Sequence, residues 1–417
     1  MKIKFVSGRQ ILDSRGDPTI ECDVVLENGI VGRASVPSGK STGGAEALEL
    51  RDGDNKFGGK GVMKAINNLN NELAPIIVGK DVENQEEIDN AMKIMDGTSN
   101  KSRLGANAIL AVSLAVCKAA ARSQNLPLWK YISNLAGTEV KMPIPMFNII
   151  NGGAHAGWTT DIQEYMIVPM GERSFSENLR IGSEIFHHLG KVLTKEKYQT
   201  TVGDEGGYAP RIRNGNDEPM FLINKAVRSA VYKLGHDVTI ALDIAASGFY
   251  EEGKYRLKAD RKTWSSDKMI DWYQNLVKRN HVSSIEDGLA ENDWPGWMEM
   301  TEKLGNKVQI VGDDLLVTNT EFLKRAIEAK AANAILIKPN QIGTVSETLA
   351  AIRMAKENDF NVIVSHRSGE TEDTFIAHLA VGTGAEYIKT GSLSRGERIA
   401  KYNELLRIEE QLSQLVD

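Results

Sequence analysis

The chain has 417 residues, of which 41% are hydrophobic and 25% charged, proportions that exclude a disordered or fibrous protein. It carries 50 lysines and arginines against 56 aspartates and glutamates, and a net charge of -6 predicts no nucleic-acid partner. No apolar stretch is long enough to predict a membrane span, and the first residues turn polar too soon for a signal peptide. Two cysteines cannot form a disulfide framework, so we expect a cytoplasmic protein.

The first third of the chain predicts a compact α+β domain. Residues 19–26 alternate in polarity as a half-buried strand does, and a Glu-Asn-Gly turn follows them. Apolar residues recur at helical spacing over 62–77, and 106–121 is almost entirely small or apolar, which predicts a buried helix. Two prolines near residue 140 mark a boundary, so we expect domains over 1–136 and 137–417.

Beyond that boundary, short apolar runs alternate with amphipathic stretches. Helices are predicted over 266–279, 320–330, 343–357 and 371–382. The apolar runs between such stretches close on a charged or titratable residue, namely Asp243, Glu286, Asp313, Lys338, His366 and Lys389. This alternation predicts consecutive βα units, that is, a parallel sheet with helices outside. In a βα barrel the carboxyl ends of the strands meet at one mouth, so we expect these side chains to gather there.

Three of these residues predict a metal site. Asp243, Glu286 and Asp313 offer carboxylate oxygens without cysteine or clustered histidine, and such hard ligands favour Mg²⁺ over zinc. The alternative for any one of them is a helix N-cap, a frequent role of acidic residues after strands. We expect the three carboxylates to share one metal ion rather than to cap three separate helices.

Lys338 follows the apolar run AILI, which would remove water from its ammonium group. Burial and nearby cations lower the pKa of a lysine, and such a lysine can serve as a general base. The alternative is a salt bridge between Lys338 and one of the carboxylates.

Glycine-rich loops carry further candidates. Glu205 lies in VGDEGGYAP and is a candidate general acid, because glycines allow close backbone approach there. His155 lies in NIINGGAHAG, although a single loop histidine is more often simply solvated. Arg367 and Ser368, in a loop that leads into a predicted helix, are the strongest anion-binding candidates.

Residues 34–41 (ASVPSGKS) nearly match a phosphate-binding loop, but Ala34 replaces the first glycine of that motif. A nucleotide-binding site would use Lys40 on the phosphates and Ser41 on Mg²⁺. Two glycines directly after the motif weaken the helix that it requires, and the surrounding segment is predicted to be antiparallel. We therefore do not favour this alternative.

Long motifs along the whole chain resemble the enolase family. They are ILDSRGDPTIE, SVPSGKSTG, ALELRDGD, LGANAILAVSLA, NIINGGAHA, DIQEYMIVP, VGDEGGYAP, ALDIAASGFY, SIEDGLAENDWPGW, QIVGDDLLVTN, IKPNQIGT, SHRSGETEDTFIA and IKTGSLSRGERIAKYNELLRIEE. The resemblance implies an α/β fold, with a small N-terminal α+β domain followed by a modified (β/α)8 TIM-like barrel. It also implies a homodimer or a larger homo-oligomer.

The resemblance implies a role for each candidate. Lys338 matches the base and Glu205 the general acid, assisted by Glu164, and His366 is counted among the catalytic residues. The implied substrate contacts are His155, Gln163, Arg367, Ser368 and Lys389. The implied metal ligands are Asp243, Glu286 and Asp313 for one Mg²⁺, and Ser41 for a second Mg²⁺ that binds with the substrate.

The activity implied is a lyase reaction of glycolysis and gluconeogenesis, the reversible dehydration of 2-phosphoglycerate to phosphoenolpyruvate. The family's lysine base removes a proton next to a metal-held carboxylate. One alternative is a related phospho- or phosphono-carboxylic acid as the substrate. Another is a non-catalytic member kept for binding or scaffolding, against which the intact Glu205, Lys338 and metal ligands argue.

Several positions depart from the family pattern. They are Lys40, the stretch 157–160 (GWTT), Gly248, Pro339 and His378. Lys40 and the 157–160 stretch lie in loops that the resemblance implies to close over the substrate. At these positions the sequence leaves open whether loop closure and the choice of substrate differ from those of the family.

Overall fold

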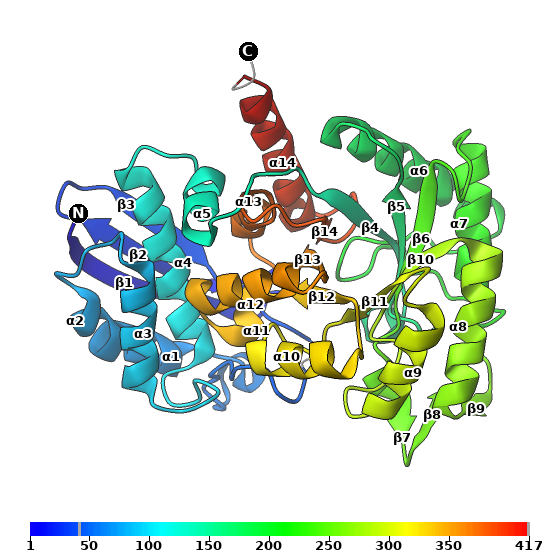
Figure 1. Cartoon of the computed structure of the whole chain (residues 1–417), viewed down its shortest axis with the longest axis horizontal. Helices are drawn as coiled ribbons and strands as arrows, with labels where there is room; N and C mark the ends of the chain where they lie inside the picture. The colour runs from blue at the N-terminus through cyan, green and yellow to red at the C-terminus, as the bar shows by residue number, and fades with distance from the viewer. Residues whose placement is uncertain (41–42, 415–417) are drawn as a thin grey trace.

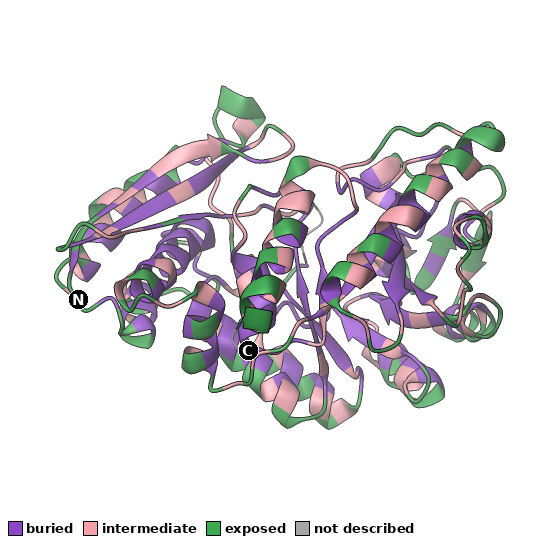
Figure 2. Cartoon of the chain, turned by 90° about the horizontal axis from the view of Figure 1, so that it is seen from above, coloured by how far each residue is buried: buried purple, intermediate pink, exposed green. Residues whose placement is uncertain are grey.

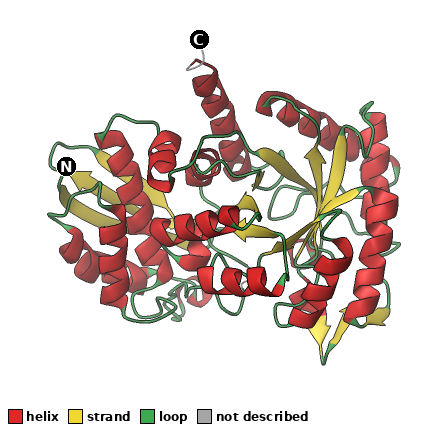
Figure 3. Ribbon diagram, viewed as in Figure 1, coloured by secondary structure: helices red, strands yellow, loops and turns green. Residues whose placement is uncertain are grey.

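The computed structural model describes residues 1–40 and 43–414, which form a small α+β domain and a closed eight-stranded barrel (Figures 1 and 3). This arrangement confirms the predicted fold class. The division at residues 136 and 137 stays a prediction, although the helix α5 (Leu128–Ala136) ends at that point and Gly137 adopts a left-handed conformation.

The N-terminal domain is built on an antiparallel meander of β1 (Ile3–Leu12), β2 (Pro18–Leu26) and β3 (Val31–Ser35). Its other elements are η1 (Lys56–Gly59), α1 (Met63–Asn68), η2 (Leu69–Leu73), α2 (Ala74–Ile77), α3 (Gln85–Asp96) and α4 (Ala106–Ser123). The predicted helix over 62–77 is therefore a helical run that contains one π-helical turn, η2. No described residue between 43 and 55 is helical, so the phosphate-binding-loop alternative for 34–41 is wrong.

Helix α4 packs across the sheet and forms the core of this domain. A Cβ atom at Gly32 of β3 would lie 2.1 Å from the carbonyl oxygen of Ala115, so only glycine allows this close approach. The helix is long and apolar enough to cross a membrane by composition, but 83% of it is buried inside the protein. It is accordingly a core helix, and both free cysteines of the domain, Cys117 on this helix and Cys22 on β2, are buried.

The barrel strands follow one another around the ring in the order in which they occur along the chain. They are β4 (Ile144–Asn151), β5 (Glu164–Pro169), β6 (Val238–Asp243), β10 (Val282–Glu286), β11 (Gln309–Gly312), β12 (Ala334–Ile337), β13 (Asn361–Ser365) and β14 (Tyr387–Lys389). Strand β5 pairs antiparallel with both β4 and β6, whereas the other neighbours are parallel. The six apolar runs predicted to form a parallel sheet are parallel, which confirms that prediction, and β5, which was not among them, needs no crossover helix because it runs back beside β4.

Helices surround the barrel, and their buried faces point toward the strands (Figure 2). They are α6 (Phe175–Lys195), α7 (Glu218–Ser229), α8 (Ser266–Asn280), α9 (Trp294–Leu304), α10 (Thr320–Ala329), α11 (Pro339–Ile342), α12 (Val345–Glu357), α13 (Phe375–Gly382) and α14 (Gly396–Gln414). A small sheet of β7 (Tyr250–Glu251), β8 (Lys254–Leu257) and β9 (Lys262–Trp264) is inserted before α8. The helix predicted over 371–382 begins only at Phe375, whose amide donates to the Asp373 carboxylate.

Buried polar contacts join the two domains. Lys118 of α4 donates to both carboxylate oxygens of Asp373 at 2.7 Å, and Asp89 of α3 accepts from the amide and hydroxyl of Ser346. A backbone bridge between Ser38 and Gly369 continues this interface. These contacts hold the loop after β3 against the loop that follows β13.

His378 explains one departure from the family pattern. Its Nε2 atom lies 3.2 Å from Oε1 of Glu404 on α14, so an aspartate at 378 would instead oppose a like charge. Hydrogen bonding from His378, together with Arg407, lowers the pKa of Glu404 to about 2.

We predict that Glu404→Gln lowers the free energy of unfolding by about 1 kcal/mol at neutral pH, a modest value because Glu404 is half-buried. The pKa of Glu404 is lower in the folded chain than its ordinary value of 4.5, so its contribution is complete above pH 4.5 and is lost as the pH falls toward 2. Urea unfolding of both proteins between about pH 2.5 and pH 7 measures this, with Glu410→Gln on the same helix as control. An equal difference at every pH would contradict it.

Candidate active site

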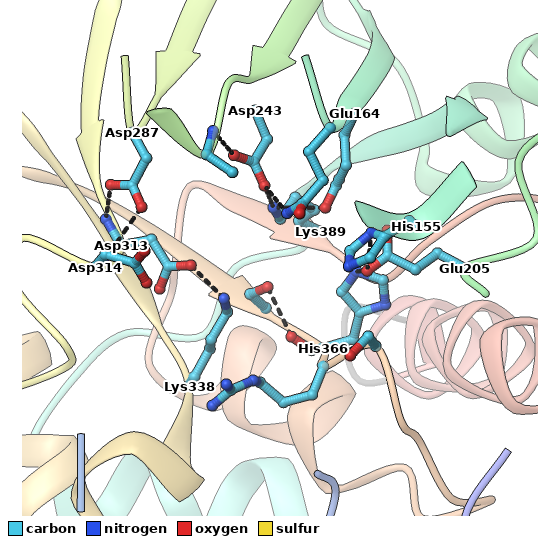
Figure 4. A pocket seen from close by; sticks show the side chains of 15 residues that line it. His155, Glu164, Glu205, Asp243, Asp287, Asp313, Asp314, Lys338, His366 and Lys389 are labelled. Carbon is cyan, nitrogen blue, oxygen red and sulfur yellow. Dashed lines mark hydrogen bonds and ion pairs between the residues drawn. The ribbon is translucent and has the colours of Figure 1, made fainter. Parts of the chain in front are cut away.

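The loops and strand ends at the carboxyl side of the barrel surround one cavity (Figure 4). It is lined by His155, Gln163, Glu164, Glu205, Asp243, Ala245, Asp287, Asp313, Asp314, Lys338, Ser365, His366, Arg367, Ser368 and Lys389. Every predicted site residue lines it except two. Glu286 lies at its margin in contact with Lys389, and Ser41 lies outside the described residues.

The strand directions explain why these residues meet. The six residues predicted from strand ends follow or terminate the parallel strands β6, β10, β11, β12, β13 and β14. Glu164 is the first residue of β5, and because β5 is antiparallel, its beginning lies at the same mouth as the ends of its neighbours. His155 comes from the 3₁₀ turn η3 (Gly153–Ala156) in the β4–β5 connection.

Lys389 is the central cation of the cavity. Its Nζ atom donates to Glu286 at 2.8 Å, Glu164 at 3.2 Å and Asp243 at 3.4 Å, and all four side chains are buried. Three strands, β5, β6 and β10, are thereby joined to β14 through one ammonium group. These carboxylates raise the pKa of Lys389 well above its ordinary value against the opposing effect of burial, so the lysine is charged.

Lys338 forms a salt bridge with Asp313, whose second oxygen accepts from Gln341 at 2.8 Å. Burial alone would lower the pKa of Lys338, but the Asp313 charge outweighs it and raises that pKa above the ordinary value. The expected lowering is therefore not observed, and the salt-bridge alternative describes this structure. In this structure the Asp313 charge therefore favours the protonated form of Lys338.

The predicted ligand trio does not form a ready-made cage. The side chains whose ligand atoms lie within 4.8 Å of one another are Asp287, Asp313 and Asp314 in one group, and His155, Glu164 and Glu205 in another. Within the trio, Asp313 is paired with Lys338, whereas Asp243 and Glu286 share Lys389. Even so, one buried oxygen of Glu286 has no hydrogen-bond partner in the described chain, and burial beside Asp243 raises the pKa of Glu286 to about 8.

The donor set nevertheless fits a hard cation. Among the described residues, the cavity and its margin hold seven carboxylates, belonging to Glu164, Glu205, Asp243, Glu286, Asp287, Asp313 and Asp314. Lys338, Lys389 and Arg367 are the cationic side chains among the same residues, and Arg367 is itself paired with Glu46. An excess of buried carboxylate oxygens is the chemistry that Mg²⁺ binding requires.

Glu164 and Glu205 form a pair whose proton affinities differ. Burial and the neighbouring Glu205 charge raise the pKa of Glu164 well above its ordinary value, although Lys389 opposes this. Burial would also raise the pKa of Glu205, but its neighbours, chiefly His155 and also Arg398, outweigh burial and hold that pKa well below the usual range. Within the pair the proton is therefore on Glu164 and the charge on Glu205, a separation typical of acid–base sites.

A basic corner adjoins this pair. Arg367 donates to both carboxylate oxygens of Glu46 at 2.9 and 3.1 Å, so the loop after β3 reaches over the barrel mouth. A Cβ atom at Gly39 would lie 2.0 Å from the Arg367 guanidinium, and the Lys40 amide donates to the Ser368 hydroxyl at 2.9 Å. The predicted anion-binding residues are thus covered by this loop.

The residues that depart from the family pattern near the cavity are accommodated by the structure around them. The Lys40 ammonium donates to the carbonyl of Ala154 and the carboxylate of Asp204, both at 3.1 Å, and so links three loops of the mouth. A Cβ atom at residue 248 would lie 3.2 Å from Cη2 of Trp158, so the glycine there leaves room for the tryptophan ring. Pro339 stands at the first position of α11, where its missing N–H is no loss.

Several residues of the site were not predicted. Asp287 accepts from the amides of Asp313 and Asp314 at 2.9 Å and so fixes the turn after β11. The acidic doublets at 286–287 and 313–314 were a signal that could have revealed them. Asn148, which donates to Glu205 at 2.8 Å, and Arg398, which contacts His366, gave no comparable signal because both are distant in sequence.

Comparison with family models agrees with this geometry. Residues 3–132 match the model of the enolase N-terminal domain, and residues 139–417 match the model of the enolase C-terminal TIM barrel domain. The two matches follow the two structural domains and cover nearly the whole chain. The chain therefore belongs to the enolase superfamily.

Proposed function

We propose that this protein is a lyase that catalyses the reversible dehydration of 2-phosphoglycerate to phosphoenolpyruvate. The observation that carries the proposal is the placement of Lys338 on one side of a cavity lined by carboxylates and of the Glu164–Glu205 pair on the other (Figure 4). A base and an acid on opposite sides of a substrate suit removal of a proton from one carbon and of a hydroxyl from the next.

Lys338 is the proposed base for the proton next to the substrate carboxylate. Its salt bridge with Asp313 keeps it protonated in the substrate-free site. It therefore becomes a base only after the negative charge of Asp313 is compensated by a cation other than the ammonium. Coupling base strength to metal occupancy in this way would prevent proton transfer before the site is assembled.

Glu205 is the proposed acid for the departing hydroxyl. In the substrate-free site Glu205 is the ionised member of its pair, so it needs a proton before it can protonate a leaving group. Glu164 holds that proton, and its carboxylate lies within 4.8 Å of that of Glu205. Transfer from Glu164 to Glu205 would prepare the acid, which supports the predicted assisting role of Glu164.

Asp243, Glu286 and Asp313 are the proposed ligands of one Mg²⁺, and a second Mg²⁺ would bind with the substrate and Ser41. When bound, Mg²⁺ supplies positive charge that stabilises the doubly charged carboxylate formed on loss of the α-proton. The proposed substrate contacts are His155, Gln163 and Lys389 in the cavity, and Arg367 and Ser368 at its basic corner. Arg367 would exchange its contact with Glu46 for the substrate phosphate.

The ultraviolet absorbance of phosphoenolpyruvate, formed from 2-phosphoglycerate with Mg²⁺, tests this function. Appearance of the product at a turnover typical of enzymes supports the proposal. Turnover of a related phospho- or phosphono-carboxylic acid, with none of 2-phosphoglycerate, would replace the substrate but keep the chemistry. No turnover of either would favour a non-catalytic role.

We predict that Mg²⁺ binding releases about one proton near pH 7. Burial beside Asp243 raises the pKa of Glu286 to about 8, so its carboxyl is mostly protonated at pH 7 and must ionise to bind metal. The affinity for Mg²⁺ should therefore rise with pH up to about 8 and then level off. Calorimetry in two buffers of different ionisation enthalpy measures the release, with Glu302→Gln on the outer face of α9 as control. Equal proton release at pH 7 and well above pH 8 would contradict the prediction.

Exchange of the substrate α-proton with solvent separates the two proposed roles. Lys338→Ala should lose this exchange and reduce turnover by about 10²- to 10⁴-fold, the usual contribution of a general base. Glu205→Gln should keep the exchange but lose overall turnover, because the hydroxyl cannot leave. Lys324→Ala, at an exposed position of α10, is the control. Equal loss of exchange in both site variants would show that the roles are not divided.

The Lys40 contacts predict a modest, salt-dependent effect on substrate affinity. Lys40 and Asp204 are partly exposed, with side-chain exposures of 45% and 31%, so their ion pair is worth about 0–1 kcal/mol. Lys40→Ala should raise KM by up to about fivefold at low salt, and the difference should shrink as salt rises. Lys303→Ala removes an ion pair of similar exposure on α9 and is the matched control. An unchanged KM at low salt would mean that the link between the loops has no effect on binding.

A further inference from the structure

Arg398, near the start of α14, is a fully buried arginine that the proposed roles leave unused. One of its nitrogens donates to Nδ1 of His366 and to the carbonyl of Arg367, both at 2.7 Å. Another donates to the carbonyls of Ser368 at 2.7 Å and Asp204 at 3.0 Å. A single guanidinium thus fixes two loops that carry candidate site residues.

The contact between Arg398 and His366 determines which ring nitrogen carries a proton. A guanidinium has five N–H donors and no acceptor, and it stays protonated in proteins. The Nδ1 atom of His366 must therefore accept this hydrogen bond with its lone pair. A neutral imidazole has one N–H, and with Nδ1 as acceptor the proton is on Nε2.

The Nε2 atom of His366 faces the cavity. It lies 3.6 Å from Oε1 of Glu205, and in the described part of the chain it has no hydrogen-bond partner. A buried donor without an acceptor is costly, and an oxygen bound between His366 and Glu205 would satisfy it.

We propose that Arg398 is a positioning residue that fixes His366 in the Nε2–H tautomer, so that His366 presents a hydrogen-bond donor to an oxygen of the ligand beside Glu205. The identity of that oxygen, the hydroxyl that leaves, rests on the proposed function, whereas the tautomer does not. Under this proposal His366 orients the hydroxyl and does not accept a proton from it.

The surroundings of His366 also keep the ring neutral. A second ring proton would have to go to Nδ1, where it would face the N–H of Arg398. The charged groups around the ring are Arg398 from α14, Lys338 after β12, Lys389 of β14 and the Glu205 carboxylate. Burial lowers the pKa of His366 well below its ordinary value, and the three cations outweigh the opposing effect of Glu205. Protonation therefore does not convert His366 into an acid at neutral pH.

Nitrogen NMR of the whole protein labelled with ¹⁵N-histidine tests the tautomer directly. The chain has seven histidines, and the His366 signals are assigned from their loss in His366→Gln. We expect a protonated Nε2, an unprotonated Nδ1 and no titration between about pH 6 and pH 8.5. An N–H at Nδ1, or a doubly protonated ring in this range, would overturn the proposal.

Variants of Arg398 test whether this residue fixes the tautomer of His366. Arg398→Met removes the donors that hold Nδ1 as an acceptor, so the His366 signals should change to a mixture of the two neutral tautomers. Turnover should fall by about 10- to 100-fold, the usual effect of losing a group that orients a functional side chain, with a much smaller change in KM. Arg398→Lys keeps a cationic donor and should retain the wild-type tautomer.

Lys401 offers the matched control. It is fully buried three residues further along α14, and it donates to Glu370 and to the carbonyl of Thr371 rather than to His366. Lys401→Met should therefore lose stability but keep the His366 spectrum. Folded Arg398→Met with a wild-type spectrum, or equal changes in both methionine variants, would refute the role of Arg398.

Two readouts keep this proposal separate from the proposed function. If Arg398→Met does not fold, the wild-type spectrum and Arg398→Lys still decide the tautomer and its cause. If the wild-type protein has the expected tautomer but does not dehydrate 2-phosphoglycerate, the proposed substrate is wrong and the inference about Arg398 stands.

Discussion

The packing of many carboxylates into one end of a barrel is the constraint on which this structure depends. Buried like charges repel strongly and must be paired, protonated or bound to a cation. Lys389 provides most of the compensation, because its ammonium contacts three carboxylates from three strands at once. Lys338 compensates a fourth, Asp313. Removing either lysine would change the proton affinity of the entire cluster.

This charge balance also explains why neighbouring residues of the same type differ in protonation. Glu164 and Glu205 are both buried glutamates, yet His155 and Arg398 lower the pKa of Glu205, whereas at Glu164 the effect of Lys389 does not overcome burial and the Glu205 charge. The difference in surroundings leaves one proton for the two groups. A small number of cations, each with a fixed position, can thus prepare an acid, a base and a neutral donor within one cavity.

Several residues by which this chain departs from the family pattern each lie against a particular partner residue. Trp158 fits beside Gly248 because the glycine has no side chain, and His378 faces Glu404, which an aspartate would repel. Lys40 contacts Asp204 across the mouth. These departures are therefore explained by contacts with residues distant in sequence, and none of them displaces a proposed catalytic group.

The sequence by itself determined several of the helices, the strand ends at the mouth of the barrel and the resemblance to the family. Strands and helices have different hydrophobic periods, and residues at the carboxyl ends of parallel strands must meet, so Asp243, Asp313 and Lys389 could be assigned to one cavity before any coordinates. Their roles in catalysis stay predictions. Ser41 lies outside the described residues, so the second metal site depends on the sequence alone.

Only the tertiary structure decided the direction of β5, the pairing of the lysines and the contact of Arg398 with His366. An apolar run such as that of β5 has the same period in either direction, and its direction is fixed by hydrogen bonding to β4 and β6. The pKa of Lys338 depends on the distance to Asp313, which local sequence does not encode. Burial predicts a lowered pKa, and a partner brought close by the fold reverses it, because electrostatic interactions depend on distance in space and not along the chain.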